Sequence, residues 1–284
     1  FITGDSVYFD SLLLDNLNDP VEFFLAKFNS VSGAVKWAIT SKGNFEKYSR
    51  IFSDNVGNIY ATGNFSGYIS FGNDTVFSRG NKDIFIAKFD SLGTVLWLKG
   101  IGSSQWDFPG DIILSGDSVL YLSGQTPDNT WFGNQLVPSG NLLSLFNAKI
   151  DANGNTKWVK FYKTSATLST ISSQIDSAGN VFIASSFIEQ IFFPTDTLTA
   201  KFGKEDGFLL KTASDGNILW LKGFGSDTTR DIVKAIAIDE RGASCLTGTF
   251  QASIDFDTLN LSGTGNEDAF IVKSDCYLVK PVIA

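Results

Sequence analysis

Acidic residues in the loops between apolar stretches are the first candidates for chemistry. Asp107, Asp111, Asp227 and Asp231 could form a carboxylate pair, which cleaves glycosidic bonds when two acids lie roughly 5 to 10 Å apart and one has a raised pKa. Nothing in the sequence pairs any two of them, and aspartates in loops usually stabilise turns. A carboxylate-dependent glycosidase or lyase is therefore an alternative, and no catalytic residue is assigned.

The other common reactive groups are missing or scarce. Histidine is absent from the 284 residues, which excludes Ser-His-Asp and Cys-His nucleophile pairs and zinc sites that use histidine. Two cysteines, Cys245 and Cys276, are too few for a four-thiolate metal site. We expect no metal, no cofactor and no enzymatic activity.

Two tryptophans in loops could instead bind a ligand. Trp106 and Trp131 have polar neighbours that are able to hydrogen-bond to sugar hydroxyls, namely Gln105, Asp107, Asp128 and Asn129. An exposed indole face stacks on an apolar ring face, and a few polar groups beside it give orientation. The alternative is that each tryptophan only fills its own loop.

The elements that position these residues recur along the whole chain. One lysine recurs every 61 or 62 residues, at Lys27, Lys88, Lys149, Lys211 and Lys273. One tryptophan recurs every 60 to 62 residues, at Trp37, Trp97, Trp158 and Trp220. Two residue types that keep the same period indicate an array of structural repeats. Trp106 and Trp131 do not follow this period.

Each repeat is predicted to contain four short antiparallel strands. In the second copy these are residues 51–54, 58–65, 84–89 and 95–99, and turns with Asp and Gly join them. Between the second and third strands lie some 17 to 20 residues, which form either a small hairpin or another ordered excursion. The lysine should lie along apolar surface and reach an acid or a carbonyl, and the tryptophan should pack between sheets.

Four-stranded repeats of about 61 residues predict an all-β fold, a β-propeller whose blades are four-stranded antiparallel sheets. The expected units are roughly 1–46, 47–107, 108–169, 170–230 and 231–284, in a single domain. The first unit would lack its innermost strand, and the five units could belong to a larger ring. In a propeller the loops with Trp106 and Trp131 would emerge on the same face and flank the third blade.

The second repeat also resembles a known family, the SBBP-type β-propeller repeat. The similar residues are Asp54, Gly57-Asn-Ile-Tyr-Ala-Thr-Gly63 and Phe65, followed by Asp83-Ile-Phe-Ile-Ala-Lys-Phe-Asp90, Gly93 and Leu96-Trp97. The resemblance covers nearly all of the chain. It implies a secreted or cell-surface protein of Bacteroidota, often type IX secretion cargo, with a binding or scaffold role and no catalytic residues. The family name implies seven blades.

Composition limits the partners. The net charge of −8 and the pI near 4.6 argue against nucleic-acid binding, because phosphate backbones require clustered cations. No apolar run is long enough for a membrane-spanning helix, and a targeting signal is expected to lie outside the chain. We therefore expect a non-catalytic module that binds a protein or a glycan at the cell surface. The alternative is a structural subunit of a larger surface assembly, together with further modules of the same polypeptide.

The two cysteines could form a disulfide within the fifth unit. Cys245 is near the start of its second strand, and Cys276 is just past the end of its third strand. Adjacent antiparallel strands bring these two ends together, and an extracellular setting would favour oxidation. Two buried free thiols are the alternative.

Overall fold

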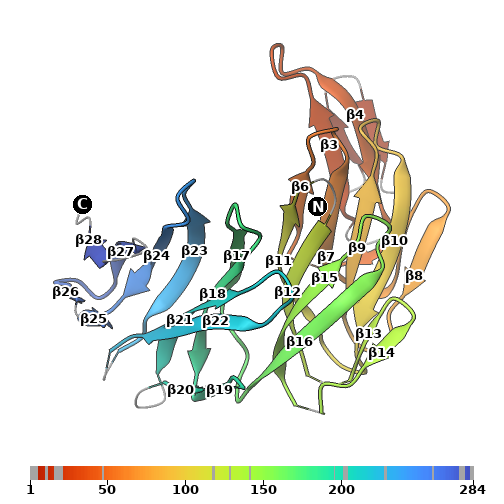
Figure 1. Cartoon of the computed structure of the whole chain (residues 1–284). Helices are drawn as coiled ribbons and strands as arrows, with labels where there is room; N and C mark the ends of the chain where they lie inside the picture. The colour runs from red at the N-terminus through yellow and green to blue at the C-terminus, as the bar shows by residue number, and fades with distance from the viewer. Residues whose placement is uncertain are drawn as a thin grey trace.

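The structure of the chain is all-β. The computed structural model describes residues 6–9, 12–15, 22–46, 48–116, 119–127, 129–140, 142–194, 196–200, 204–226, 229–257, 259–274 and 279–281. All regular secondary structure within these ranges is β-strand (Figure 1). Accordingly, none of the described residues belongs to a helix with the length and hydropathy needed to span a membrane.

Four-stranded antiparallel meanders repeat along the chain. Sheet 2 contains β6 (Arg50–Ser53), β7 (Ile59–Phe71), β9 (Asp83–Phe89) and β10 (Val95–Gly102); sheet 3 contains β11 (Phe108–Ser115), β12 (Val119–Thr126), β15 (Ser144–Ile150) and β16 (Thr156–Thr164). Sheet 4 contains β17 (Ile171–Ile175), β18 (Val181–Ile188), β21 (Glu205–Thr212) and β22 (Ile218–Phe224); sheet 5 contains β23 (Ile232–Ile238), β24 (Ser244–Phe250), β27 (Asp268–Ser274) and β28 (Val279–Pro281). In sheet 1 the structure describes the pair β3 (Phe24–Phe28) and β4 (Val35–Thr40).

The periodic lysine and tryptophan are cross-strand neighbours. They lie opposite each other in the third and fourth strands of sheets 1 to 4, as Lys27–Trp37, Lys88–Trp97, Lys149–Trp158 and Lys211–Trp220. A register shift lies directly beside this pair in all four sheets. The repeat in the sequence is therefore a repeat of strand pairing.

The segments between the second and third strands form hairpins, one of the two possibilities left open by the sequence. They are the end of β7 with β8 (Asp74–Phe77), β13 (Thr130–Phe132) with β14 (Gln135–Val137), β19 (Gln190–Phe192) with β20 (Thr197–Thr199), and β25 (Ser253–Phe256) with β26 (Leu259–Ser262). A similar hairpin, β1 (Ser6–Phe9) with β2 (Leu12–Asp15), precedes sheet 1.

These hairpins reach back to the sheet of the preceding repeat. β13 pairs with the end of β10, and β19 pairs with the end of β16. The end of β7 pairs with β5 (Lys42–Phe45), which continues β4 after Ser41. A single bridge joins Gly225, at the end of β22, to Asp255 in β25. Each repeat thus extends the outer edge of the sheet before it.

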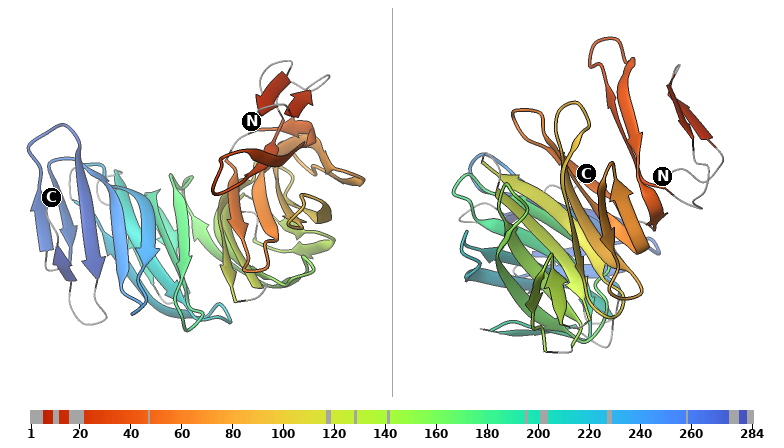
Figure 2. Two further views of the ribbon diagram at one scale, coloured as in Figure 1. Left: turned by 90° about the horizontal axis from the view of Figure 1, so that it is seen from above. Right: turned by 90° about the vertical axis from the view of Figure 1, so that its right-hand side faces the viewer.

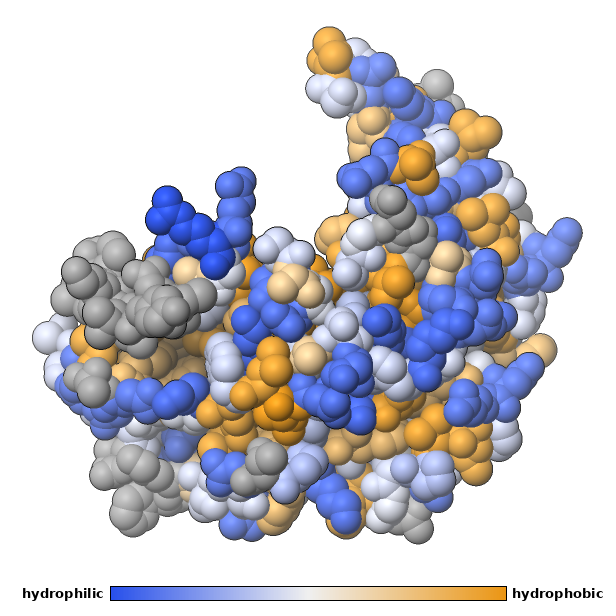
Figure 3. All heavy atoms as spheres, viewed as in Figure 1, coloured by the Kyte–Doolittle hydropathy of each residue, from blue (hydrophilic) through white to orange (hydrophobic). Residues whose placement is uncertain are grey.

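The sheets stand face to face and form an arc. Figure 1 shows the chain passing from the red and orange N-terminal strands through green sheet 3 to blue sheet 5, and Figure 2 shows the first and last sheets at the two ends of the arc. The space-filling view is hollowed between these two ends (Figure 3). The first strands of neighbouring sheets, β6, β11, β17 and β23, contact one another in this order.

Each junction between sheets has its own apolar core. The same position of the third strand supplies a buried phenylalanine to each core: Phe85 between sheets 1 and 2, Phe146 between sheets 2 and 3, Phe208 between sheets 3 and 4, and Phe270 between sheets 4 and 5. These four rings are at most 2% exposed. Burial of repeated aromatic side chains holds the sheets together.

The periodic tryptophans join each sheet to the next one. A Cβ added at the turn glycine of the following sheet would lie 3.0 to 3.1 Å from the indole, for the pairs Trp37–Gly93, Trp97–Gly154 and Trp158–Gly216. The indole N–H of Trp37 donates to the Ser91 carbonyl at 3.2 Å, and that of Trp97 donates to the Ala152 carbonyl at 2.9 Å. Only a residue without a side chain allows the indole to approach the turn this closely.

Four of the five periodic lysines reach an acid or a carbonyl, as expected. Lys27 and Lys149 donate from Nζ to the carbonyls of Ser91 and Ser214, at 2.9 and 3.0 Å. Lys211 forms an ion pair with Asp176 at 3.0 Å, and Lys273 forms one with Asp239 at 2.8 Å. Lys88 lies 5.1 Å from the centre of the Tyr60 ring.

Candidate functional site

Trp106 and Trp131 lie beside the same loop, residues 78–82, which leads into β9. The Nζ of Lys82 is 5.0 Å from the centre of the Trp106 ring, and the Cζ of Arg79 is 4.7 Å from the centre of the Trp131 ring. Cations at these distances are attracted to the face of an indole. Each of the two non-periodic tryptophans therefore has a cation from this loop against its ring. We call Trp106, Trp131, Arg79 and Lys82 the binding edge.

Backbone hydrogen bonds fix the loops of the binding edge. The amides of Asn81 and Lys82 donate to the carbonyl of Gln105 at 3.0 and 3.2 Å, and the amide of Asp107 donates to the carbonyl of Lys82 at 2.8 Å. Lys82 also forms an ion pair with Glu46 at 2.7 Å. Trp106 is 50% exposed, and these hydrogen bonds fix the loop that carries it.

The polar residues predicted around the two tryptophans have different positions. The side chain of Gln105 is exposed next to Trp106. Asn129 is half-buried, and its Oδ1 accepts a hydrogen bond from the amide of Ser139 at 3.1 Å. Asp128 lies outside the described residues. Gln105 is therefore the predicted polar neighbour that a surface ligand can reach most directly.

Asp107 is buried, although the sequence predicts it as a ligand contact. It is 0% exposed, and its Oδ2 accepts hydrogen bonds from the amide and the hydroxyl of Ser103, at 2.7 and 3.0 Å. The carboxylate is needed to close the turn after β10, because these buried donors would otherwise have no acceptor. Asp107 therefore stabilises the loop of Trp106 through its hydrogen bonds to Ser103.

A second buried carboxyl supports the loop of Arg79. Asp83 begins β9 and is 1% exposed, and its Oδ2 accepts a hydrogen bond from the amide of Arg79 at 2.9 Å. Its carboxyl lies against Gly102, where an added Cβ would overlap it. Sheet 4 repeats this arrangement, with Asp206 against Gly225 and with Asp231 accepting the amide and hydroxyl of Ser226 at 2.7 and 2.9 Å.

Burial shifts the protonation of two of these acids. The pKa of Asp83 is raised to about 7, chiefly because burial removes water from the carboxylate; the Arg79 amide opposes this shift and the negative charge of Asp107 adds to it. The pKa of Asp231 is raised to about 6, again chiefly by burial, against the hydrogen bonds from Ser226. Both groups bind a proton more tightly in the folded state than in the unfolded state.

We expect Asp83→Asn to flatten the pH dependence of folding stability. Because the folded pKa of about 7 lies above the ordinary value of 3.8, the contribution of Asp83 is complete below the ordinary pKa and is lost as the pH rises through the folded pKa. The loss should be on the order of 4 kcal/mol. Asparagine cannot ionise but still accepts the Arg79 amide. Urea denaturation across this pH range measures the slope, with exposed Asp74→Asn as control, and an unchanged slope in Asp83→Asn would contradict the assignment.

A pocket of about 210 Å³ adjoins the binding edge, where the first strands of sheets 2, 3 and 4 begin. Phe108 forms part of its wall, and the Phe108 ring contacts Trp106 with a centroid distance of 6.4 Å. Tyr48, from the connection that leads into β6, and Arg50, the first residue of β6, line it as well. We call this cavity the axial pocket. The aromatic surface of the binding edge continues into it through Phe108.

Three of the four acids considered for catalysis lie within the described residues, and each accepts hydrogen bonds from other groups of the fold. Asp111 accepts the amides of Ser173 and Ile112, each at 3.0 Å, and burial raises its pKa. Asp107 and Asp231 are buried at different sheet junctions, and Asp227 lies outside the described residues. Each described carboxylate of this set is therefore engaged in holding a turn or a strand in place.

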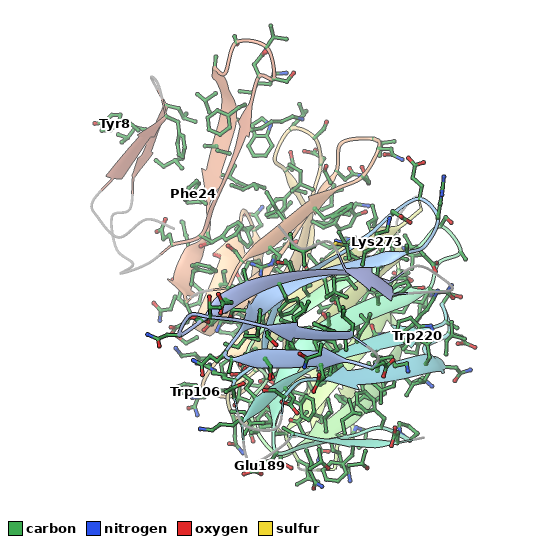
Figure 4. The ribbon with its side chains drawn as sticks, turned by 90° about the vertical axis from the view of Figure 1, so that its left-hand side faces the viewer. Tyr8, Phe24, Trp106, Glu189, Trp220 and Lys273 are labelled. Carbon is green, nitrogen blue, oxygen red and sulfur yellow. The ribbon has the colours of Figure 1, made fainter. Side chains whose placement is uncertain are left out.

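A larger pocket, of about 490 Å³, lies between sheets 4 and 5. Trp220 and Phe224 of sheet 4 line it, together with Gly242, Ser244 and Phe256 of the fifth repeat. Ser244 occupies the strand position that is apolar in the other sheets, as Ile59, Leu120 and Val181. Figure 4 shows Trp220 and Trp106 at opposite edges of the stacked sheets. This pocket reflects weaker packing at the last junction.

The cysteine prediction is only half covered by the described residues. Cys245 is half-buried in β24, opposite Lys273 of β27. Cys276 lies outside the described residues, so the disulfide stays a prediction. Within the described ranges, no group of three or more acidic or cysteine side chains is placed to hold a metal ion.

Sequence reasoning missed the cations and the axial pocket. Arg79 and Lys82 fall in the long excursion between strands, where charged residues are common and carry no specific signal. One signal was available in the sequence: the two cations are not repeated. The corresponding positions of the next repeat are Gly140 and Leu143. The tryptophans and the cations of the binding edge are therefore all residues that do not follow the period.

Comparison with known proteins yields no relative from which a function could be transferred. No protein-family model matches the chain, and no curated protein matches it. The binding edge and the axial pocket are therefore the features of this chain that point to a function.

Proposed function

We propose that this chain is a non-catalytic β-propeller module that binds a glycan at the binding edge. The observation that carries the proposal is the convergence of Trp106 and Trp131 on one loop that also supplies Arg79 and Lys82. These residues come from two different repeats and lie outside the 61-residue period, so the repeated scaffold does not need them.

The propeller architecture is supported by the arrangement of the sheets. Four-stranded antiparallel meanders stand face to face, their first strands contact one another, and their outer strands lie away from this line of contact. Radial repetition of such sheets is the defining feature of propeller blades. The five repeats would form a propeller or part of a larger ring. The resemblance to SBBP-type repeats favours a secreted or cell-surface location.

Sugar binding is supported by the chemistry of the edge. The half-exposed ring of Trp106 offers an apolar face for stacking on a pyranose, and the exposed Gln105 next to it offers amide groups to the hydroxyls. The cations on the indoles hold the rings in place before a ligand arrives, and such preorganisation lowers the cost of binding. The acids that support the loops of this surface, Asp83 and Asp107, are at most 1% exposed and cannot reach a substrate, and the carboxylate of Glu46 is paired with Lys82 at 2.7 Å.

We expect Trp106→Ala and Trp131→Ala each to weaken glycan binding roughly tenfold or more. A few aromatic side chains usually supply most of the affinity of a binding site, and these substitutions remove them. Electrophoresis through gels that contain soluble xylan, mixed-linkage β-glucan, pectin or alginate measures the retardation. Trp220→Ala, at the opposite edge, is the matched control and should migrate like the unmodified protein.

Equal retardation of all three variants would refute the proposed site. Failure of all four polysaccharides to retard the unmodified protein would count against glycan binding and leave a protein ligand as the next candidate.

A further inference from the structure

The size of the axial pocket limits what it can hold. Its volume of about 210 Å³ is below the range of about 300 to 1,000 Å³ that is typical of sites for drug-sized ligands. A single ring or a substituent of a larger ligand fits such a volume. Tyr48 and Phe108 give it aromatic walls, and the Trp106–Phe108 contact leads from it to the binding edge.

The charge in the pocket comes from one side chain. Arg50 is the only charged residue among the described residues that line it. Its Nη1 donates to the carbonyl of Ser49 at 3.2 Å, and its Nε is 4.0 Å from the nearest oxygen of Asp111. The side chain remains 52% exposed. The guanidinium therefore keeps donors available for a second acceptor, and its planar fork matches a carboxylate.

The backbone of the pocket wall is strained. Tyr48 has a φ of 59°, in the left-handed region, which is unfavourable for a bulky side chain. Its side chain gains little packing in return, since Tyr48 is 61% exposed. Strained residues of this kind concentrate at binding sites, where the strain holds a side chain in the geometry that a ligand needs.

We propose that the axial pocket binds the carboxylate-bearing ring of an acidic glycan, a uronate. Arg50 pairs with the carboxylate, and Tyr48 and Phe108 flank the ring. The neighbouring sugars of the chain then lie on Trp106 and toward Lys82 and Arg79, along the path that the Trp106–Phe108 contact marks. This inference depends on the proposed glycan-binding function and adds the chemical class of its ligand.

The test compares a uronate polymer with its neutral ester, and adds other acidic polymers beside this pair. Affinity electrophoresis is run with pectate and with its highly methyl-esterified form, and in parallel with alginate, hyaluronate and dextran sulfate. We expect at least one uronate polymer to bind about tenfold more tightly than its neutral ester, because hydrogen bonds to charged groups are worth this much. Added salt should reduce the preference, since exposed charge pairs are screened.

Two variants separate the inference from the proposed function. Arg50→Gln removes the charge but keeps a polar side chain, and we expect it to bind the acid and the ester equally, whereas Trp106→Ala should weaken both. A charge preference that survives in Arg50→Gln, or preferential binding of dextran sulfate, would overturn the uronate site while leaving glycan binding intact. If no polymer binds and Trp106→Ala changes nothing, both fail. Arg50→Lys, which restores the charge without the fork, should recover only part of the preference.

Discussion

Replacing Gly102 with alanine should lower the free energy of unfolding by about 2 to 3 kcal/mol. The new Cβ would overlap the carboxyl of Asp83, which is 1% exposed and is held by the amide of Arg79. Neither group can move without loss, because Gly102 also pairs with Trp131 across β10 and β13. The same variant should therefore disturb the binding edge. Urea denaturation and near-ultraviolet circular dichroism measure the two effects.

Gly100 provides a control on the same strand. A Cβ there would meet Val76 at 3.6 Å, an ordinary contact, and Gly100→Ala should change stability by no more than about 0.5 kcal/mol. Removing the carboxyl in Asp83→Ala should offset part of the Gly102→Ala effect in the double variant, as expected for residues in direct contact. Equal destabilisation by Gly100→Ala and Gly102→Ala would show that the Asp83 contact is not the cause.

Trp97→Ala should be the other strongly destabilising change, by about 3 kcal/mol. Its indole lies 3.1 Å from the position of a Cβ on Gly154, donates to the carbonyl of Ala152 at 2.9 Å, and lies 6.3 Å from the Tyr60 ring centre. Truncation would remove the packing and leave a carbonyl without its donor. Thermal and chemical unfolding of the purified variant measure the loss.

Trp220→Ala is the matched comparison, because Trp220 is the same tryptophan of the repeat. It is 37% exposed, and its indole N–H has no hydrogen bond to any described residue. We expect its truncation to cost less than about 1.5 kcal/mol. The difference between the two variants measures what the contacts of Trp97 with Ala152 and Gly154 contribute. Equal losses would mean that this contribution is small.

Much of the fold could be predicted from the sequence, because the signal repeats. Strand pairing between Lys88 and Trp97 recurs at every period, and a local pattern that is repeated several times outweighs the ambiguity of any single strand. The reach of each hairpin into the preceding sheet could not be predicted in the same way. It depends on pairing between β10 and β13, which belong to different repeats, and hydrophobic alternation carries no information about the partner of a strand.

The candidate site was predictable only where it breaks the repeat. Trp106 and Trp131 were identified because the scaffold does not require them, and the structure places both beside one loop. The burial of Asp107 was not predictable, because it is set by the donors of Ser103 and by the turn after β10. Arg50 and Tyr48 line the pocket from the start of β6 and from the connection before it, and no spacing in the sequence links them to Trp106.

The hairpins that extend each preceding sheet also set an order of assembly for the protein during translation. The outer edge of β10 has its partner only after β13 has left the ribosome, and β16 likewise waits for β19. A nascent chain therefore always carries one unpaired strand edge, the kind of surface through which sheets aggregate. Steady elongation through each excursion would shorten this exposure, whereas a pause between the two strands of a pair would prolong it.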